Sequence, residues 1–262
     1  LKVDFNHTGA EAAANTGLGF NSFALPAIGP GPFKRTYGGA EVTLSGVGCN
    51  LESRLRTTPV NSADFTEEKL MLDFIFARDA AMGQGLDVTV DGLEPNQLYQ
   101  ATVWSFDAVS VTVDRISDWS ANGELVKEGY LFFGSNLPTD NDRYRFSFNT
   151  AADENGRLLI QGRRNVAAAG ALNVFLTALA ITRREITVQR IEIPDINLLR
   201  LTIEVLDPTV PLRIESKRSL SDPNWFEVSD VYYYDPVGNI IEAEFELPQG
   251  YPAGFFRVVA QP

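Results

Sequence analysis

The stretch GLDVTVDGLEPNQLYQATVWSF, residues 85–106, decides the fold class. It contains two runs, 85–93 and 98–106, in which apolar side chains alternate with others, separated by the pair Pro95-Asn96. Alternation with period two is the pattern of a β-strand. Proline presets a turn φ and asparagine tolerates the left-handed region, so the pair favours a turn. The stretch therefore predicts two strands joined by a short turn.

The same pattern recurs on both sides of this stretch. Phe, Val, Ile, Tyr and Thr are common in the runs, whereas Gly, Pro, Asn and Asp lie between them, which is typical of β-proteins. Ten short strands predict an all-β fold, a jelly-roll β-sandwich, for residues 1–183. The eight further strands are expected at 2–6, 19–25, 40–46, 69–77, 124–133, 143–150, 156–163 and 172–182.

The remaining residues predict a second, smaller domain. Residues 184–197 lack glycine-rich turns and contain Pro194, so we expect an extended linker there. Strand patterns then return, and they predict a small immunoglobulin-like β-sandwich over 198–262. Its strands are expected at 199–206, 212–218, 225–235, 240–247 and 254–260.

Composition excludes several classes of function. The chain has 262 residues, a net charge of -12, one cysteine and one histidine. An acidic surface repels nucleic acid and anionic lipid, and neither an intrachain disulfide nor a Cys/His zinc site can form. No apolar run is long enough to predict a membrane span. Because Leu1 stands where Met would begin a chain, we expect a mature or excised segment.

Catalytic motifs are missing from the sequence. His7 is the only histidine and there is no Gly-x-Ser-x-Gly pattern, so we expect a surface turn residue at this position rather than a member of a triad. Carboxylates are plentiful, but no spacing identifies an acid and base pair. We predict a non-catalytic protein, with a polysaccharide-active enzyme as one alternative.

Two of the three tryptophans lie close together in the sequence, and they lead to different expectations. Trp104 belongs to the predicted strand 98–106, so we expect its side chain in the core, with a role in ligand binding as the alternative. Trp119 lies in DRISDWSANG, which we interpret as a loop. An indole in a loop can form a flat plate for a sugar, or it can fold back and close the end of the sandwich with its N–H capped.

These residues define a candidate ligand site. Polar side chains near Trp119 could bind sugar hydroxyls. Arg54 and Arg56 lie two positions apart, on one face of an extended segment, where they could hold a carboxylate or sulfate or pair with local acidic residues. The predicted ligand-binding residues are Trp119, Asp118, Arg115, Asn122, Asp107, Trp104, Arg54 and Arg56.

A structural calcium ion is a further expectation, because carboxylates from separate loops suffice to bind it. Turn formation is the alternative role for each candidate aspartate. The candidates are Asp4, Asp140, Asp142 and Asp153.

A series of motifs over about residues 1–183 resembles a module of large secreted proteins of environmental bacteria. The motifs are VDFN, Arg54-x-Arg56, DFIF at 73–76, GLEPNQLYQATVWSFD, SDWSANG, ADENGRLLIQGR and NVFLTALAI. At the fold level the module is similar to galactose-binding-like jelly rolls, many of them non-catalytic carbohydrate-binding modules with a structural calcium. The remainder, with SKRSLSDPNWFEV and GFFRVV, is similar to small C-terminal sandwiches of such proteins.

The resemblance implies an extracellular or cell-surface location and attachment to glycans. Our leading hypothesis is a secreted, non-catalytic protein that binds polysaccharide or cell-surface glycan. The alternative is a structural subunit of an extracellular filament, sheath or surface layer. In that case copies of the chain would exchange strands such as 2–6 and 254–260.

Overall fold

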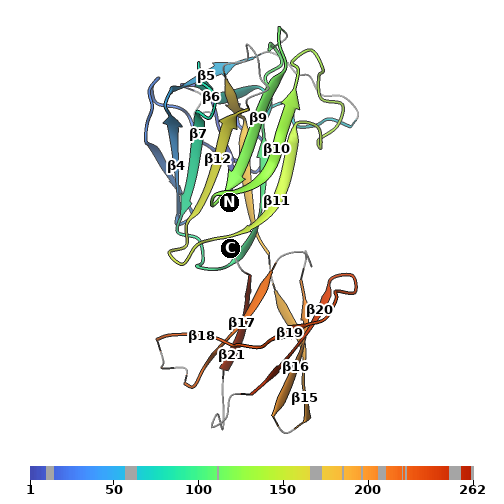
Figure 1. Cartoon of the computed structure of the whole chain (residues 1–262). Helices are drawn as coiled ribbons and strands as arrows, with labels where there is room; N and C mark the ends of the chain where they lie inside the picture. Colours follow the sequence, from blue (N-terminus) through green and yellow to red (C-terminus); the bar gives the residue numbers. More distant parts are fainter. Residues whose placement is uncertain are drawn as a thin grey trace. The chain divides into compact units, whose positions relative to one another are not determined.

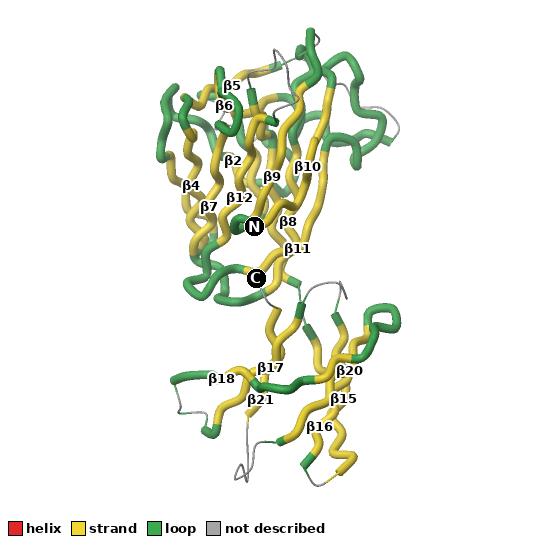
Figure 2. The backbone as a smooth tube through the Cα atoms, in the orientation of Figure 1, coloured by secondary structure: helices red, strands yellow, loops and turns green. Residues whose placement is uncertain are grey.

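The computed structural model confirms the all-β class. It describes residues 1–9, 15–56, 64–110, 112–165, 173–184, 186–195, 197–205, 211–219, 221, 223–247 and 255–260. These residues form strands and loops without a helix (Figure 2), and so contain no helix that could cross a membrane. The chain divides into two compact units, one mainly of residues 1–182 and the other mainly of residues 183–262.

The first unit contains three sheets (Figure 1). A five-stranded sheet has the order β11 (Arg145–Ala151), β8 (Leu98–Trp104), β14 (Ala178–Arg183), β1 (Lys2–Asp4) and β2 (Asn21–Ser22). A six-stranded sheet has the order β10 (Glu124–Phe132), β9 (Arg115–Ala121), β12 (Leu158–Arg164), β7 (Gly85–Asp91), β4 (Ala40–Val47) and β3 (Phe33–Tyr37). The third sheet consists of β13 (Val174–Leu176), β6 (Asp73–Arg78) and β5 (Asn50–Leu55).

Aromatic side chains join these sheets into a sandwich. The ring of Phe146 on β11 contacts Trp119 on β9, with 5.7 Å between ring centroids, and Tyr130 on β10, at 5.2 Å. Phe132 on β10 meets Phe175 on β13, with centroids 5.4 Å apart. Because these rings come from facing sheets, they form the core that the predicted jelly-roll sandwich requires.

The predicted turn between 85–93 and 98–106 forms a corner between two sheets. β7 belongs to the six-stranded sheet and β8 to the five-stranded sheet, so the turn leads the chain from one layer to the other. Asn96 has a φ of 57°, the left-handed value that asparagine tolerates. The Tyr99 hydroxyl accepts the backbone N–H of Glu94 at 3.0 Å, as a structural corner tyrosine does.

The segment around Trp119 differs from the prediction of a loop. Residues Arg115–Ala121 form strand β9, which pairs with β10 on one side and β12 on the other. Asn122 and Gly123, with φ of 48° and 90°, turn the chain into β10. Two successive residues with positive φ are typical of a type I′ hairpin. Serine and aspartate between the apolar residues conceal an ordinary alternation, in which Ser117, Trp119 and Ala121 are buried.

The second unit is a smaller sandwich of two sheets, as predicted. One has the order β15 (Thr187–Asp195), β16 (Leu198–Glu204), β20 (Ile240–Glu246) and β19 (Tyr232–Tyr233). The other consists of β18 (Phe226–Glu227), β17 (Leu212–Lys217) and β21 (Phe255–Ala260). Both sheets contribute to one buried cluster, which includes Leu201, Ile214 and Phe245.

The linker expected at 184–197 requires a correction. Strand β15 occupies most of it and pairs antiparallel with β16, from Thr187 opposite Glu204 to Asp195 opposite Leu198. Its extended conformation agrees with the sequence, but its backbone hydrogen bonds are made to the second sandwich. Pro194 is compatible with this position because β15 lies at the edge of its sheet.

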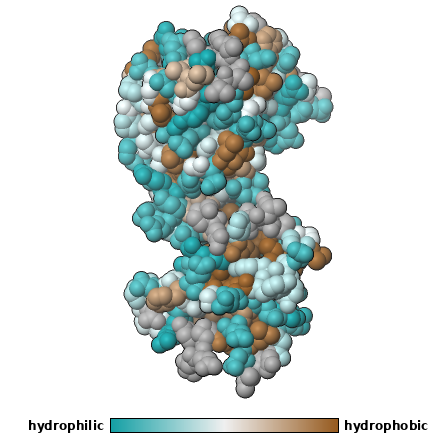
Figure 3. All heavy atoms as spheres, in the orientation of Figure 1, coloured by the Kyte–Doolittle hydropathy of each residue, from teal (hydrophilic) through white to brown (hydrophobic). Residues whose placement is uncertain are grey.

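The viewed surface of the first unit is mainly hydrophilic, with small separated hydrophobic groups (Figure 3). On this face a ligand would therefore meet mainly polar side chains.

Candidate functional site

A pocket of about 280 Å³ is lined by residues of the β13-β6-β5 sheet, of the loop after β8 and of the beginning of β9. It brings together four of the eight predicted ligand residues, Arg54, Arg56, Asp107 and Arg115. Other lining residues are Phe74, Phe76, Arg78, Asp79, Val109, Ser110, Thr112, Asn173 and Phe175. We call this site the arginine pocket.

Strand alternation explains how the arginine pocket is built. On β5 the side chains of Glu52 and Arg54 share one face, and Arg56 continues it just beyond the strand. On β6 the alternate residues Phe74 and Phe76 lie opposite Arg54 and Glu52 in the register. Because successive side chains of a strand point to opposite faces, one segment supplies the charges and its neighbour supplies the rings.

The floor of the pocket consists of phenylalanine rings that lie beneath guanidinium groups. Phe74, Phe76 and Phe175 are at most 6% exposed. Arg54 lies over Phe76 with its Cζ 5.4 Å from the ring centroid, and Arg56 lies over Phe74 at 5.3 Å. Since the arginines cover the rings, the groups available to a ligand are N–H donors rather than aromatic faces.

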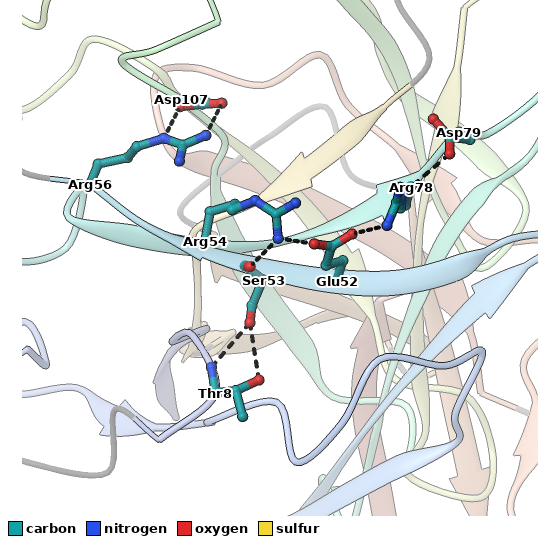
Figure 4. A network of polar contacts seen from close by, with 8 residues as sticks. All are labelled: Thr8, Glu52, Ser53, Arg54, Arg56, Arg78, Asp79 and Asp107. Carbon is teal, nitrogen blue, oxygen red and sulfur yellow. Dashed lines mark hydrogen bonds and ion pairs between the residues drawn. The ribbon is translucent and has the colours of Figure 1, made fainter.

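Arg56 is held by a two-point ion pair with Asp107, which lies in the loop after β8. Arg56 Nε donates to Asp107 Oδ1 at 2.8 Å and Nη2 donates to Oδ2 at 3.1 Å (Figure 4). Asp107 is 5% exposed, and its Oδ1 also accepts the backbone N–H of Val109 at 3.0 Å. The pair therefore connects β5 to the loop that forms one wall of the pocket.

A second network runs along the sheet through Glu52. Arg54 and Arg78 each pair with one oxygen of the buried Glu52 carboxylate, the contact from Arg78 Nη1 to Oε2 measuring 2.8 Å (Figure 4). Arg78 also donates from Nε to Asp79 at 3.2 Å. These ion pairs hold the guanidinium groups of Arg54 and Arg78 in place along the sheet.

Arg115 approaches the pocket from the beginning of β9. Its Cζ lies 5.6 Å from the centroid of the Phe175 ring, and its Nε donates to the Ser110 hydroxyl. Within the described part of the chain, no carboxylate forms an ion pair with Arg115. Burial lowers the pKa of Arg115, while the charge of Asp107 opposes this shift.

The prediction for Trp119 as a sugar-binding plate is wrong. The indole is fully buried, and its Nε1 donates to the Ser117 hydroxyl at 3.0 Å. Its ring packs against Phe146 and lies above Gly162 on the neighbouring strand. Of the two interpretations of this tryptophan, the capped core residue is the one that the structure has.

Trp104 is a core residue, as its strand position predicts. It is 4% exposed, contacts the ring of Phe20 edge-on, and donates from Nε1 to Glu67 at 3.0 Å. Burial raises the pKa of Glu67, whereas the hydrogen bond from Trp104 lowers it. Trp104 does not line the arginine pocket.

The side chains of Asp118 and Asn122 accept hydrogen bonds from neighbouring segments and do not line the arginine pocket. Asp118 accepts the backbone N–H of Gly129 at 2.7 Å and the side-chain amide of Asn165. The Asn122 side chain accepts the backbone N–H of Leu159 at 2.9 Å. These two predicted site residues therefore stabilise the contacts of β9 with its neighbours.

The aspartates proposed for calcium do not converge. Asp140 accepts the backbone N–H groups of Asp142 and Arg143, which lowers its pKa, and Asp142 pairs with Arg145. Asp153 lies in the segment 151–154, which is assigned to the second unit. Among the described residues, no three His, Cys, Asp or Glu side chains form a group that could hold a metal ion.

Asp4, the fourth candidate, is buried beside another carboxylate. Its Oδ2 accepts the backbone N–H of Gly17 at 2.7 Å. Burial raises the pKa of Asp4 to about 8, and the nearby charge of Asp73 adds to this effect.

His7 differs from the expected surface turn residue, because its ring contacts a buried aspartate as the histidine of a catalytic triad does. Its Nδ1 is 2.7 Å from Oδ2 of the buried Asp73, and its side chain is 23% exposed. In the described ranges, however, no serine or cysteine forms a hydrogen bond with its ring. The nucleophile that a triad requires is therefore not at hand.

Sequence reasoning missed Arg78, Asn173 and Ser110 among the residues of the pocket. Arg78 could have been found, because it follows Phe74 and Phe76 at alternate positions on β6. The other two come from loops, whose position depends on the fold.

Comparison with known proteins adds structural neighbours. No protein-family model matches the chain, and no curated protein matches it. A Paenibacillus xanthan lyase is similar over 80% of this chain and 25% of its own, with 10% identity and a TM-score of 0.30. The chain thus spans about a quarter of that enzyme's length.

Two further neighbours are carbohydrate-binding modules from Paenibacillus barcinonensis. CBM35 is similar over 57% of this chain and 96% of its own, with 9% identity and a TM-score of 0.27. The tandem CBM22-1-CBM22-2 of Xyn10C is similar over 87% and 85%, with 9% identity and a TM-score of 0.30.

Proposed function

We propose that the chain is a secreted, non-catalytic protein whose first unit binds carbohydrate in the arginine pocket. The observation that carries the proposal is the convergence of Arg54, Arg56, Asp107 and Arg115 around one opening on a rigid sheet. Guanidinium groups donate several N–H bonds and carboxylates accept them, which is the chemistry that sugar oxygens need. A site with convergent polar groups on a rigid scaffold needs little rearrangement on binding.

The ion pairs around the pocket support binding rather than catalysis. The carboxylates around it, Glu52, Asp79 and Asp107, are each paired with arginine. These carboxylates accept hydrogen bonds from the guanidinium groups and hold them in place. They therefore suit positioning of the arginines for a ligand better than transfer of a proton to a glycosidic oxygen.

Affinity electrophoresis on a panel of polysaccharides tests the proposal. We expect retardation on at least one polysaccharide, and loss of this retardation in Arg115→Ala. The matched control is Arg157→Ala, which removes the same charge from a surface pair with Asp91 outside the pocket. Absence of retardation on every polysaccharide would overturn carbohydrate binding, and release of reducing ends from the bound glycan would overturn the non-catalytic part.

A second proposal is self-association of the structural-subunit type. Strand β15 lies at the edge of its sheet and exposes Val188, Ile191 and Ile193 by 39%, 64% and 65%. An edge strand with apolar side chains is a template for pairing with another copy. Light scattering should show a mass that rises with concentration and falls back to the monomer in Ile191→Lys; a constant monomer mass would exclude it.

A further inference from the structure

The charge balance of the arginine pocket points to the class of carbohydrate. Four guanidiniums, those of Arg54, Arg56, Arg78 and Arg115, face the three carboxylates that the ion pairs place around them. This local excess of positive charge stands in a chain whose net charge is -12. The acidic surface of the chain repels a polyanion, whereas the positive pocket attracts it.

The arginines are not equally neutralised. Arg56 is committed to Asp107 by two hydrogen bonds. Arg54 and Arg78 share the carboxylate of Glu52, and Arg78 also pairs with Asp79. Arg115 donates to the neutral hydroxyl of Ser110 and forms no ion pair within the described ranges. A half-buried guanidinium without a direct counter-ion is stabilised when an anion binds beside it.

Stacking on the aromatic floor orients these groups. Arg54 and Arg115 lie over Phe76 and Phe175, with Cζ to centroid distances of 5.4 and 5.6 Å. A planar guanidinium fixed in this way presents N–H groups in a fork that matches the two oxygens of a carboxylate or a sulfate ester. The buried phenylalanines offer a neutral sugar no uncovered ring face to stack on.

We propose that the arginine pocket binds the anionic group of an acidic polysaccharide, a carboxylate or a sulfate ester, between Arg115 and Arg54. The inference rests on the proposed function and specifies its ligand class. The pocket volume of about 280 Å³ suits one charged sugar residue with the rest of the polymer outside.

Paired glycans test this inference. Polygalacturonate is compared with the same polymer after reduction of its carboxyl groups, and dextran sulfate is compared with dextran, by affinity electrophoresis and calorimetry. We expect binding to a charged member and at least tenfold weaker binding to its neutral partner. The pair that shows the difference identifies carboxylate or sulfate as the group. Higher salt should weaken the binding.

Substitutions of Arg115 and Arg54 test whether the arginine pocket is the binding site. Arg115→Gln should weaken binding to the charged glycan at least tenfold, and Arg115→Lys should weaken it less because it keeps the charge without the fork. Arg157→Gln is the control for net charge. The melting temperature of each variant, measured alongside, shows whether the fold is retained. If Arg115→Gln is poorly folded, Arg54→Gln serves as the second variant, with the same expected loss.

The outcomes separate the two proposals. Equal binding to charged and neutral partners would overturn the anionic ligand and leave carbohydrate binding intact. Charged-glycan binding that survives both Arg115→Gln and Arg54→Gln would overturn this pocket as the site. Binding to no polysaccharide of either kind would overturn the proposed function itself.

Discussion

Trp119 and Gly162 are cross-strand partners on β9 and β12, and the indole of Trp119 occupies the space beside Gly162 where a side chain would lie. A Cβ added at Gly162 would stand 2.9 Å from two carbons of the indole and 3.0 Å from Val174 Cγ1. The glycine therefore makes room for the fully buried indole of Trp119.

Gly162→Ala should destabilise the protein through this close approach. Overpacking of a well-filled core costs about 1–3 kcal/mol, so we expect the melting temperature to fall by several degrees. Gly29→Ala is the control, since its added Cβ would meet only Phe33 at 3.7 Å, an ordinary contact. Equal melting temperatures for the two variants would contradict this packing.

Trp119→Ala should reduce stability much more. Removal of a large buried aromatic side chain costs about 3–5 kcal/mol, measured as a shift of the denaturant midpoint. Leu125→Ala, at an exposed position on the adjacent strand β10, should change it little. Wild-type stability in Trp119→Ala would mean that the indole is not in the core.

Arg56 and Asp107 should be energetically coupled. Hydrogen bonds to charged groups contribute about 1.5–3 kcal/mol when they are shielded from water, and both side chains are largely buried, at 22% and 7% exposed. A double-mutant cycle with Arg56→Ala and Asp107→Ala measures the coupling free energy of unfolding.

The matched cycle uses the surface pair of Arg157 and Asp91, whose side chains are 56% and 36% exposed. Exposed pairs contribute about 0–1 kcal/mol, so its coupling should be clearly smaller. A coupling no larger than that of this surface pair would show that Asp107 does not hold Arg56 in place.

Asp4 should make stability fall as pH rises. Burial raises its pKa from 3.8 to about 8 in the folded chain, so between these values the folded state keeps a proton that the unfolded state releases. The free energy of unfolding therefore decreases from about pH 4 to about pH 8, by an amount of the order of a few kcal/mol.

Asp4→Asn should flatten this slope, because an amide does not titrate. Asp140→Asn is the control: hydrogen bonds from its turn lower the pKa of Asp140, so its contribution is lost only as pH falls below about 4. Urea titrations at a series of pH values give the slope for each variant. A slope above pH 5 that Asp4→Asn leaves unchanged would refute the buried, protonated carboxyl group.

The predicted strands and the two sandwich classes could be read from periodicity, as β7, β8 and β12 illustrate. Among the described strands of both units, β3, β5, β9 and β15 were not predicted, and the last two show a physical cause. In β9, serine and aspartate interrupt the apolar pattern, and in β15 a proline within an edge strand imitates a linker. Tolerance of Pro194 follows from the position of β15 in the sheet, which the local sequence does not state.

Only part of the candidate site could be predicted, because some of its residues become neighbours only in the folded chain. Arg54 and Arg56 share a face because they lie two positions apart, and that relationship is local. Their convergence with Asp107, 51 residues further along the chain, and with Arg115 depends on which strands and loops become neighbours. Trp119 was misplaced because its burial depends on a glycine 43 positions away on the paired strand.

By itself, then, the sequence determined the strands of residues 85–106 and the turn at Pro95-Asn96, because alternation and turn preference act over a few residues. The tertiary structure alone decided that β7 and β8 belong to different sheets, that Trp119 is in the core, and that the arginines meet above Phe74, Phe76 and Phe175. Side-chain period fixes the face of a strand, whereas the strand that lies beside it is chosen by the packing of the whole domain.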